Sequence, residues 1–338
     1  MTPAELTDRW TELGAGRRGS SGMDRRRLDA EAAVDIFACV FWPQGRSGLL
    51  IQGAGRVDAL AERMPKCRGV RVEHEEREGR PSEPLTQVTI RLEEDRLRDI
   101  FAVLAADLVN TVVAEPAAPA ALRRCVDRLC MWQGLFERLS PEGLSDEHQR
   151  GLYGELVVMD AQVLEENRLL RGVSAWTGPD ADHHDFRMGG VALEVKTTLA
   201  KRHARIPIAN ERQLDERAHD ALLLASVRLD ESEAHGRSLP AVVANLRERL
   251  GGEEAAARLF DEKLVLADYL DVHAPLYDAR RFRVTSTDWF RVEGDFPRLT
   301  GAGLPAGVGD IRYSIIADDL DRWRIAEDEV TTLLGGAG

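Results

Sequence analysis

The pattern of apolar and polar positions is most regular between residues 145 and 229. Apolar residues at helical spacing predict a helix over residues 146–167, and Ser145 is a suitable N-cap for it. Further along, the pattern predicts three strands, a second helix that begins at Asn210, and a continuous apolar strand, at residues 185–188, 191–199, 205–209, 210–219 and 221–229. The predicted order is therefore α-β-β-β-α-β.

The sequence on either side predicts further structure around this core. Residues 1–113 are expected to form an N-terminal α/β domain, with a strand hairpin near residues 36–52 and a helix at 97–113. An alanine- and proline-rich stretch follows, so residues 114–140 are expected to be a linker and a connecting helix. The core should span residues 141–230, and an α/β extension should occupy residues 231–338. The predicted fold class is mixed α/β (α+β).

Composition and charge narrow the functional classes. The chain has 338 residues, with 45 Lys and Arg against 58 Asp and Glu, which gives a formal net charge of -13. That charge disfavours binding to a polyanion such as nucleic acid. No apolar run is long enough to span a membrane, no signal peptide is visible, and the four cysteines form no CxxC pair. We therefore expect a cytoplasmic protein with no membrane partner and no structural zinc.

The most informative segment is DFRMGGVALEVK, which begins at Asp185. The two glycines in its middle favour a two-residue hairpin turn, and counting outward opposes Phe186 to Leu193 and Asp185 to Glu194. Cross-strand neighbours have Cβ atoms about 4.5–5.5 Å apart, and two carboxylates so placed repel each other. A divalent cation between them would reverse the sign of that interaction. Such oxygen-rich sites suit Mg²⁺, with Mn²⁺ as a substitute.

Two further residues complete the predicted site. Lys196 lies two positions after Glu194 on the same strand, so both side chains project from one face. Its ammonium group there would stabilise negative charge on a phosphate oxygen or position a water for attack. Glu155 lies with the apolar stripe of the first helix, where a carboxylate is costly unless it is paired or bound to metal.

Other kinds of site find less support. His183 and His184 are adjacent on an extended segment and point to opposite faces, which disfavours their binding one zinc ion. The chain contains no G-x-S-x-G sequence and no phosphate-binding glycine loop of the usual kinds. Asp180 and Asp182 remain rivals of Asp185 as the first carboxylate of the site.

These residues resemble the PD-(D/E)XK nuclease superfamily, which has the restriction-endonuclease-like αβββαβ core. Asp185 matches the first carboxylate, Glu194-Val195-Lys196 matches the (D/E)XK, and Glu155 matches the acidic residue of the first helix. More narrowly, the chain resembles a bacterial family of PD-(D/E)XK motif proteins that are often encoded in anti-phage defence loci. The segments that carry this narrower resemblance are GLYGEL at 151–156, Trp176 to Pro179, His184 to Phe186, EVKTT at 194–198, Gln213-Leu214, and DFPR with the later LP at 295–305.

The resemblance implies a role for each matching residue. Asp185, Glu194 and the Val195 carbonyl would hold Mg²⁺, and Glu155 would bind a second ion or its water. Lys196 would assist the attacking water. Gln213 would orient Lys196 or contact the phosphate. One departure keeps Asp180 and Asp182 as alternatives: Asp185 is not preceded by proline, and the literal Pro179-Asp180 lies five residues earlier.

The implied function is a Mg²⁺-dependent endonuclease that hydrolyses DNA in a bacterial restriction or anti-phage defence system. Charge counted locally supports this, because residues 196–217 hold six cations against three anions. The candidate DNA-binding residues in and near that segment are Lys201, Arg202, Arg205 and Arg212. A non-cleaving DNA-binding or assembly subunit, and a nuclease that acts on RNA, are the alternatives. Partners would be DNA and other defence-system proteins, and the resemblance leaves a homodimer open.

Overall fold

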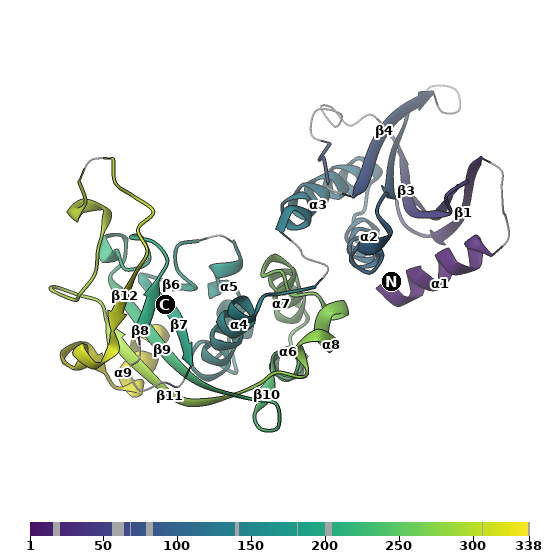
Figure 1. Ribbon diagram of the computed structural model, residues 1–338. Coiled ribbons are helices and arrows are strands. Elements are labelled where there is room, and N and C mark those ends of the chain that lie inside the picture. The colour runs from purple at the N-terminus through teal and green to yellow at the C-terminus, as the bar shows by residue number, and fades with distance from the viewer. Residues whose placement is uncertain are drawn as a thin grey trace. The chain divides into compact units, whose positions relative to one another are not determined.

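The structure is a computed structural model that describes residues 1–15, 21–55, 64–67, 69–78, 84–138, 142–180, 182–199, 205–305 and 307–336. The chain divides into two compact units, Met1–Pro141 and Glu142–Gly338 (Figure 1). Each unit has its own sheets and helices. No helix within the described ranges is both long and apolar enough to cross a membrane.

The first unit is built on a five-stranded antiparallel sheet in the order β1-β2-β3-β5-β4. Its strands are β1 (Gly22–Asp29), β2 (Asp35–Trp42), β3 (Arg46–Ala54), β4 (Val70–Glu78) and β5 (Pro84–Leu92). Its helices are α1 (Pro3–Gly14), α2 (Arg98–Val113) and α3 (Ala118–Arg138). The pairing of β2 with β3 confirms the predicted hairpin, and α2 confirms the helix predicted at residues 97–113.

The stretch expected as a linker and connecting helix belongs to the first unit. Only residues 114–117 separate α2 from α3, and α3 packs against both α2 and β3. Asp107 of α2 accepts hydrogen bonds from Arg128 Nε at 2.6 Å and from Trp132 Nε1 at 2.7 Å. Gly53 of β3 lets α3 approach, because a Cβ there would lie 2.9 Å from the Cβ of Ala118. The division between units falls after residue 141 rather than before residue 114.

The second unit is built on a six-stranded sheet in the order β10-β11-β9-β7-β6, with β13 paired to β11. Its strands are β6 (Phe186–Met188), β7 (Val191–Leu199), β9 (Ala221–Ser232), β10 (Arg237–Ser238), β11 (Arg281–Arg291) and β13 (Arg324–Ile325). β7 and β9 run parallel, and the other pairs are antiparallel. The continuous apolar pattern of residues 221–229 correctly predicts β9, whose first seven residues are all buried.

The helices of the second unit come from both ends of its sequence. They are α4 (Asp146–Val158), α5 (Leu169–Ala175), α6 (Leu239–Leu250), α7 (Glu254–Leu266), α8 (Ala274–Tyr277) and α9 (Glu327–Gly336). Residues of α4, α5, α6 and α7 share one hydrophobic cluster with the sheet. The region expected as a C-terminal extension is therefore packed into the same core as the predicted catalytic segment.

The first predicted helix is shorter than expected at its C-terminal end. Ser145 caps α4 as predicted, with its hydroxyl oxygen accepting a hydrogen bond from His148 N at 3.3 Å. After Val158 the chain continues as a π-helical turn, Met159–Val163, rather than as an α-helix to residue 167. The extra residue in this turn ends the regular bonding pattern.

Two of the six predicted core elements differ from the structure. β8 (Arg205–Ile208) does form, but it pairs with β12 (Tyr313–Ile316) in a separate two-stranded sheet. The helix predicted at residues 210–219 does not form, and turns and a short 3₁₀ segment, Glu216–Ala218, stand in its place. Asn210 Oδ1 accepts from Arg212 N at 2.9 Å, and Gln213 Oε1 accepts from Ala209 N at 2.8 Å. These bonds stabilise a tight turn instead of opening a helix.

Candidate active site

The hairpin that carries Asp185 and Glu194 has the predicted register. Phe186 pairs with Leu193, and Met188 pairs with Val191. Asp185 lies one residue before β6, and its Oδ2 accepts a hydrogen bond from Val195 N at 2.7 Å. This bond holds the Asp185 carboxylate beside the strand that bears Glu194 and Lys196.

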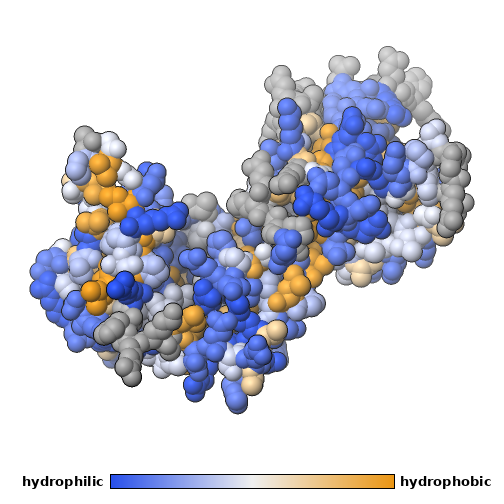
Figure 2. Space-filling model, viewed as in Figure 1, coloured by the Kyte–Doolittle hydropathy of each residue, from blue (hydrophilic) through white to orange (hydrophobic). Residues whose placement is uncertain are grey.

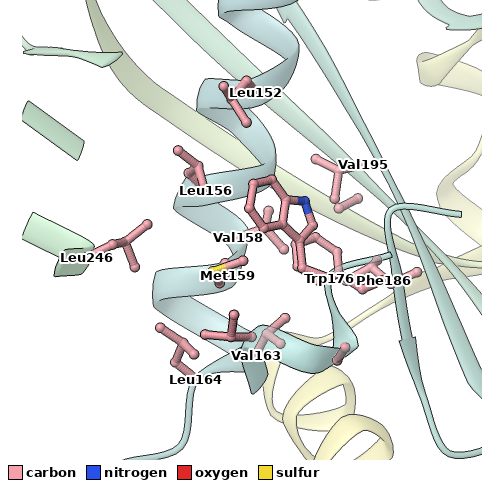
Figure 3. Packing of buried hydrophobic residues seen from close by; sticks show 14 of the residues in the cluster. Leu152, Leu156, Val158, Met159, Val163, Leu164, Trp176, Phe186, Val195 and Leu246 are labelled. Atoms are coloured by element: carbon pink, nitrogen blue, oxygen red, sulfur yellow. The ribbon is translucent and has the colours of Figure 1, made fainter. Parts of the chain in front are cut away.

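Helix α4 brings the third carboxylate to this strand. The close contact is made at Gly154, where a Cβ would lie only 2.1 Å from Thr197 Cγ2 of β7. Glu155 follows directly, and its Oε2 accepts a hydrogen bond from Trp176 Nε1 at 2.8 Å. Figure 3 shows the Trp176 ring beside α4, on the side of the helix where Val195 lies. The close approach at Gly154 thus positions Glu155 beside the strand.

Glu194 is buried with a single cationic neighbour. Its side chain is 1% exposed, and its Oε1 lies 2.6 Å from Lys196 Nζ. Apart from this ion pair, neither carboxylate oxygen of Glu194 has a hydrogen-bond partner in the part of the chain that the structure describes. A buried carboxylate with so few partners is costly unless a further positive charge lies nearby.

The site holds three acidic groups and one ammonium group, and their pKa values reflect this imbalance. Burial and the charge of Asp185 raise the pKa of Glu155 to about 8, against the hydrogen bond from Trp176. Burial and Asp185 raise the pKa of Glu194 well above its ordinary value. Burial raises the pKa of Asp185, although Lys196 opposes the shift. Burial alone would lower the pKa of Lys196, but Glu194 and Asp185 outweigh it and raise that pKa.

The donor set fits a hard divalent cation. The carboxylates repel one another, and the oxygens of Glu194 lack neutral donors. Ions such as Mg²⁺ and Mn²⁺ prefer oxygen ligands of this kind. As placed, however, no three His, Cys, Asp or Glu side chains in the described ranges converge into a ready metal-binding group.

The two rival carboxylates have other partners. Asp180 Oδ2 lies 2.6 Å from Lys263 Nζ, and Asp182 Oδ2 lies 3.0 Å from Arg187 NH1. Asp185 is the aspartate whose charge acts on Glu155 and on Glu194. The geometry therefore favours Asp185, as the hairpin register predicted.

The neighbouring histidines, His183 and His184, have different surroundings. His184 is buried, and its ring meets that of His219 edge-on at a centroid distance of 4.8 Å. Burial lowers the pKa of His184 to about 4. His183 is exposed, and its Nε2 lies 3.4 Å from Arg212 NH1. The two adjacent imidazoles thus face different surroundings.

The structure separates the remaining predicted site residues. Arg205 and Arg212 are exposed, the first on β8 and the second in the turn after it. Gln213 was expected on a helix near Lys196, but its side-chain oxygen caps the turn at Ala209. Lys201 and Arg202 lie outside the described residues.

Two residues of the site neighbourhood were not predicted to have a role. In the sequence, Trp176 belongs only to one of the segments that carry the family resemblance. Its contact with Glu155 joins residues that are 21 positions apart, so no local pattern indicates it. Lys263 lies in α7 at helical spacing from the apolar Ala256 and Phe260, and this position on the apolar stripe is the signal that could have marked it as a buried cation.

Comparison with protein families gives a match over most of the chain. A family described as "Putative PD-(D/E)XK family member, (DUF4420)" matches residues 6–318. Comparison with the curated proteins and with the solved structures gives no match.

Proposed function

The chain belongs to this PD-(D/E)XK family, and on that premise we propose that it is a metal-dependent endonuclease that hydrolyses phosphodiester bonds of DNA. The observation that carries the proposal is the buried Glu194 carboxylate, which pairs with Lys196 while Asp185 and Glu155 repel it. A purely structural core gains nothing from three such acids around one ammonium group. A site that binds a cation and a phosphate requires them.

The proposed ligands of a Mg²⁺ ion, for which Mn²⁺ can substitute, are Asp185, Glu194, the Val195 carbonyl and Glu155. When bound, such an ion supplies positive charge to the phosphate oxygens and activates water. Glu194 and Asp185 raise the pKa of Lys196 in the metal-free protein. Lys196 is placed to act by charge and hydrogen bonding toward a phosphate oxygen or the attacking water.

The distribution of charge limits which residues of the second unit can bind DNA. Residues 142–338 carry 24 Lys and Arg against 36 Asp and Glu, whereas residues 1–141 are almost balanced, at 21 against 22. DNA binding by the second unit must therefore rely on local cations. We assign this role to Arg205 and Arg212, which are exposed, and to Lys201 and Arg202 between Lys196 and Arg205 in the sequence. Weak, salt-sensitive affinity for DNA follows.

A protein partner would compensate for this weak affinity. The narrower family resemblance supports a cytoplasmic role in restriction or anti-phage defence, with other proteins of that system as partners. Exposed apolar side chains around β12 offer a contact surface, namely those of Leu299, Val308 and Ile316. Figure 2 shows that hydrophilic residues cover much of this face and that hydrophobic residues gather at several places on it. A second copy of the chain is an alternative occupant of that surface.

One observation favours a second candidate function. Because Lys196 closes against Glu194, and no three acidic ligands converge in the described chain, the site as placed is not set to hold an ion. A subunit that keeps the fold for DNA binding or assembly, without cleavage, would tolerate this arrangement.

Cleavage of supercoiled plasmid separates the two functions. Purified full-length protein is incubated with plasmid and Mg²⁺, Mn²⁺ or Ca²⁺, with and without proteins encoded beside it, and in parallel with single-stranded RNA. We expect nicking or linearisation with Mg²⁺ and Mn²⁺, loss of it in Lys196→Ala, and none with Ca²⁺. The matched control is Lys66→Ala, an exposed lysine of the first unit. Absence of cleavage under every condition would contradict the proposed nuclease activity. Cleavage of RNA but not of DNA would show that the substrate is RNA.

A further inference from the structure

We propose that Trp176 is a positioning residue for Glu155, and that Lys263 in turn holds Trp176 in place. This inference rests on the proposed metal-dependent function and extends it to residues of the C-terminal region. It assigns a role to a buried tryptophan and a buried lysine that hold no predicted ligand or substrate themselves.

The indole of Trp176 is fixed on several sides. The residue is 0% exposed, and its ring lies 6.0 Å from that of Phe260 of α7, measured between centroids. Its backbone forms an isolated bridge with Phe186 at the start of the hairpin. With this packing, the donated bond from Nε1 to Glu155 Oε2 at 2.8 Å sets the rotation of that carboxylate.

Lys263 secures the segment that carries this tryptophan. It is only 5% exposed, and its Nζ donates to the carbonyl of Trp176 and to Asp180 Oδ2, the latter at 2.6 Å. A buried ammonium group is costly unless such partners surround it. Lys263 thereby joins both ends of residues 176–180 to α7.

The same short segment lies between the carboxylates of the site. Thr177 N and Gly178 N both donate to the carbonyl of Asp185, at 2.8 and 3.0 Å. A Cβ on Gly178 would lie 3.2 Å from Asp185 Oδ1 and 3.4 Å from Glu155 Oε2. A displacement of residues 176–180 therefore moves the partners of Asp185 and Glu155 together.

The consequence is a carboxylate that is oriented before any ion arrives. A donated hydrogen bond stabilises the ionised form of Glu155, which is the form that binds a cation. Outer partners of metal ligands typically contribute about 10–100-fold to metal affinity. Trp176 is the outer partner of Glu155 by this reasoning, and Lys263 acts one contact further away.

Metal binding measured by titration calorimetry tests this without any cleavage assay. The probes are Mg²⁺ and Mn²⁺ alone, added to the full chain. Trp176→Phe removes the donor and keeps an aromatic ring, and we expect its affinity for Mn²⁺ to fall by about tenfold or more. Asp180→Asn weakens the hold on Lys263 at a partly exposed position and should give a smaller loss. The matched control is Trp289→Phe, another buried tryptophan of the same core, with no expected change.

Indole ¹⁵N–¹H spectra give a second readout that a merely structural role would not move. The Trp176 signal, assigned by its absence in Trp176→Phe, should shift as Mg²⁺ is added, and Glu155→Gln should abolish that shift. The signal of Trp10, whose indole donates to Gly48 O in the first unit, should stay in place. Unchanged metal affinity in Trp176→Phe, or a stationary Trp176 signal while the wild type binds Mg²⁺, would overturn the positioning role. A wild type that binds neither ion overturns the proposed metal-dependent function itself, and the positioning role with it.

Discussion

Gly154 and Thr197 meet so closely that residue 154 can carry no side chain, since a Cβ there would lie 2.1 Å from Thr197 Cγ2. Gly154→Ala should therefore destabilise the second unit by about 1–3 kcal/mol, as overpacking usually does, despite the better helix propensity of alanine. Chemical denaturation measures this loss. Thr197→Ser removes the opposing methyl group, so the double variant should recover most of the stability. A single Gly154→Ala variant that is as stable as the wild type would contradict the tight contact.

Glu194→Gln should stabilise the protein in the absence of metal, by about 1 kcal/mol, because it removes one of three mutually repelling carboxylates. Lys196 retains Asp185 and Glu155 as negative neighbours. Thermal unfolding with and without Mg²⁺ measures the effect, and stabilisation by Mg²⁺ should be lost. Glu211→Gln is the matched control. That buried carboxylate accepts a bond from Ile311 N at 3.1 Å, so its loss should destabilise. A lower stability of Glu194→Gln would contradict the electrostatic reasoning.

Stability of the metal-free protein should fall as the pH rises. Glu155 has its pKa raised from 4.5 to about 8, and Glu194 and Asp185 shift in the same direction. The folded state therefore binds more protons than the unfolded state between these limits, and stability present at pH 4.5 is lost toward pH 8. Each extra proton contributes at most about 1.4 kcal/mol per pH unit.

Urea denaturation from pH 5 to pH 8 checks this dependence. Mg²⁺ should flatten the slope, because a bound cation favours the ionised carboxylates, and Glu155→Gln should reduce it. A stability that increases steadily over this range would show that the site carboxylates are ionised in the folded state at little cost.

Arg212→Ala and Arg205→Ala should weaken DNA binding without regard to sequence. Fluorescence anisotropy with a labelled duplex, in Ca²⁺ and at several salt concentrations, measures the affinity. Each lost phosphate contact should lower the slope of log affinity against log salt by about 1. Arg258→Ala, an exposed arginine of α7, is the control. If all three substitutions lowered the affinity equally, DNA binding would depend on the overall charge of the protein and not on Arg205 and Arg212.

The part of the site that depends on short-range pattern could be predicted from the sequence. The turn glycines and the opposed Phe186 and Leu193 fix the register of β6 and β7, and with it the place of Asp185. The cap of α4 could be predicted for the same reason, because Ser145 accepts its hydrogen bond from a residue only three positions later.

The rest depends on partners far away in the chain or on competing local bonds. β8 pairs with β12, about a hundred residues later in the sequence, and the pattern of neither strand indicates which strand it pairs with. Asn210 and Gln213 have side chains that suit a helix start and a tight turn equally well, and the turn is what forms. The helical spacing of Lys263 from Ala256 and Phe260 marks a buried cation, but its partners could not be predicted, because only tertiary packing places α7 against residues 176–180.

The position of Lys263 in the chain also bears on when the candidate site can be completed during synthesis. During synthesis, Asp185, Glu194 and Lys196 leave the ribosome before α7 and β11, which complete the sheet and the support of Trp176. A nascent chain or a fragment cut near residue 230 would carry the whole acidic motif yet lack these supports. The site therefore gains its outermost support only when α7 has been synthesised, so an incomplete copy carries the acidic side chains without the contacts that position them.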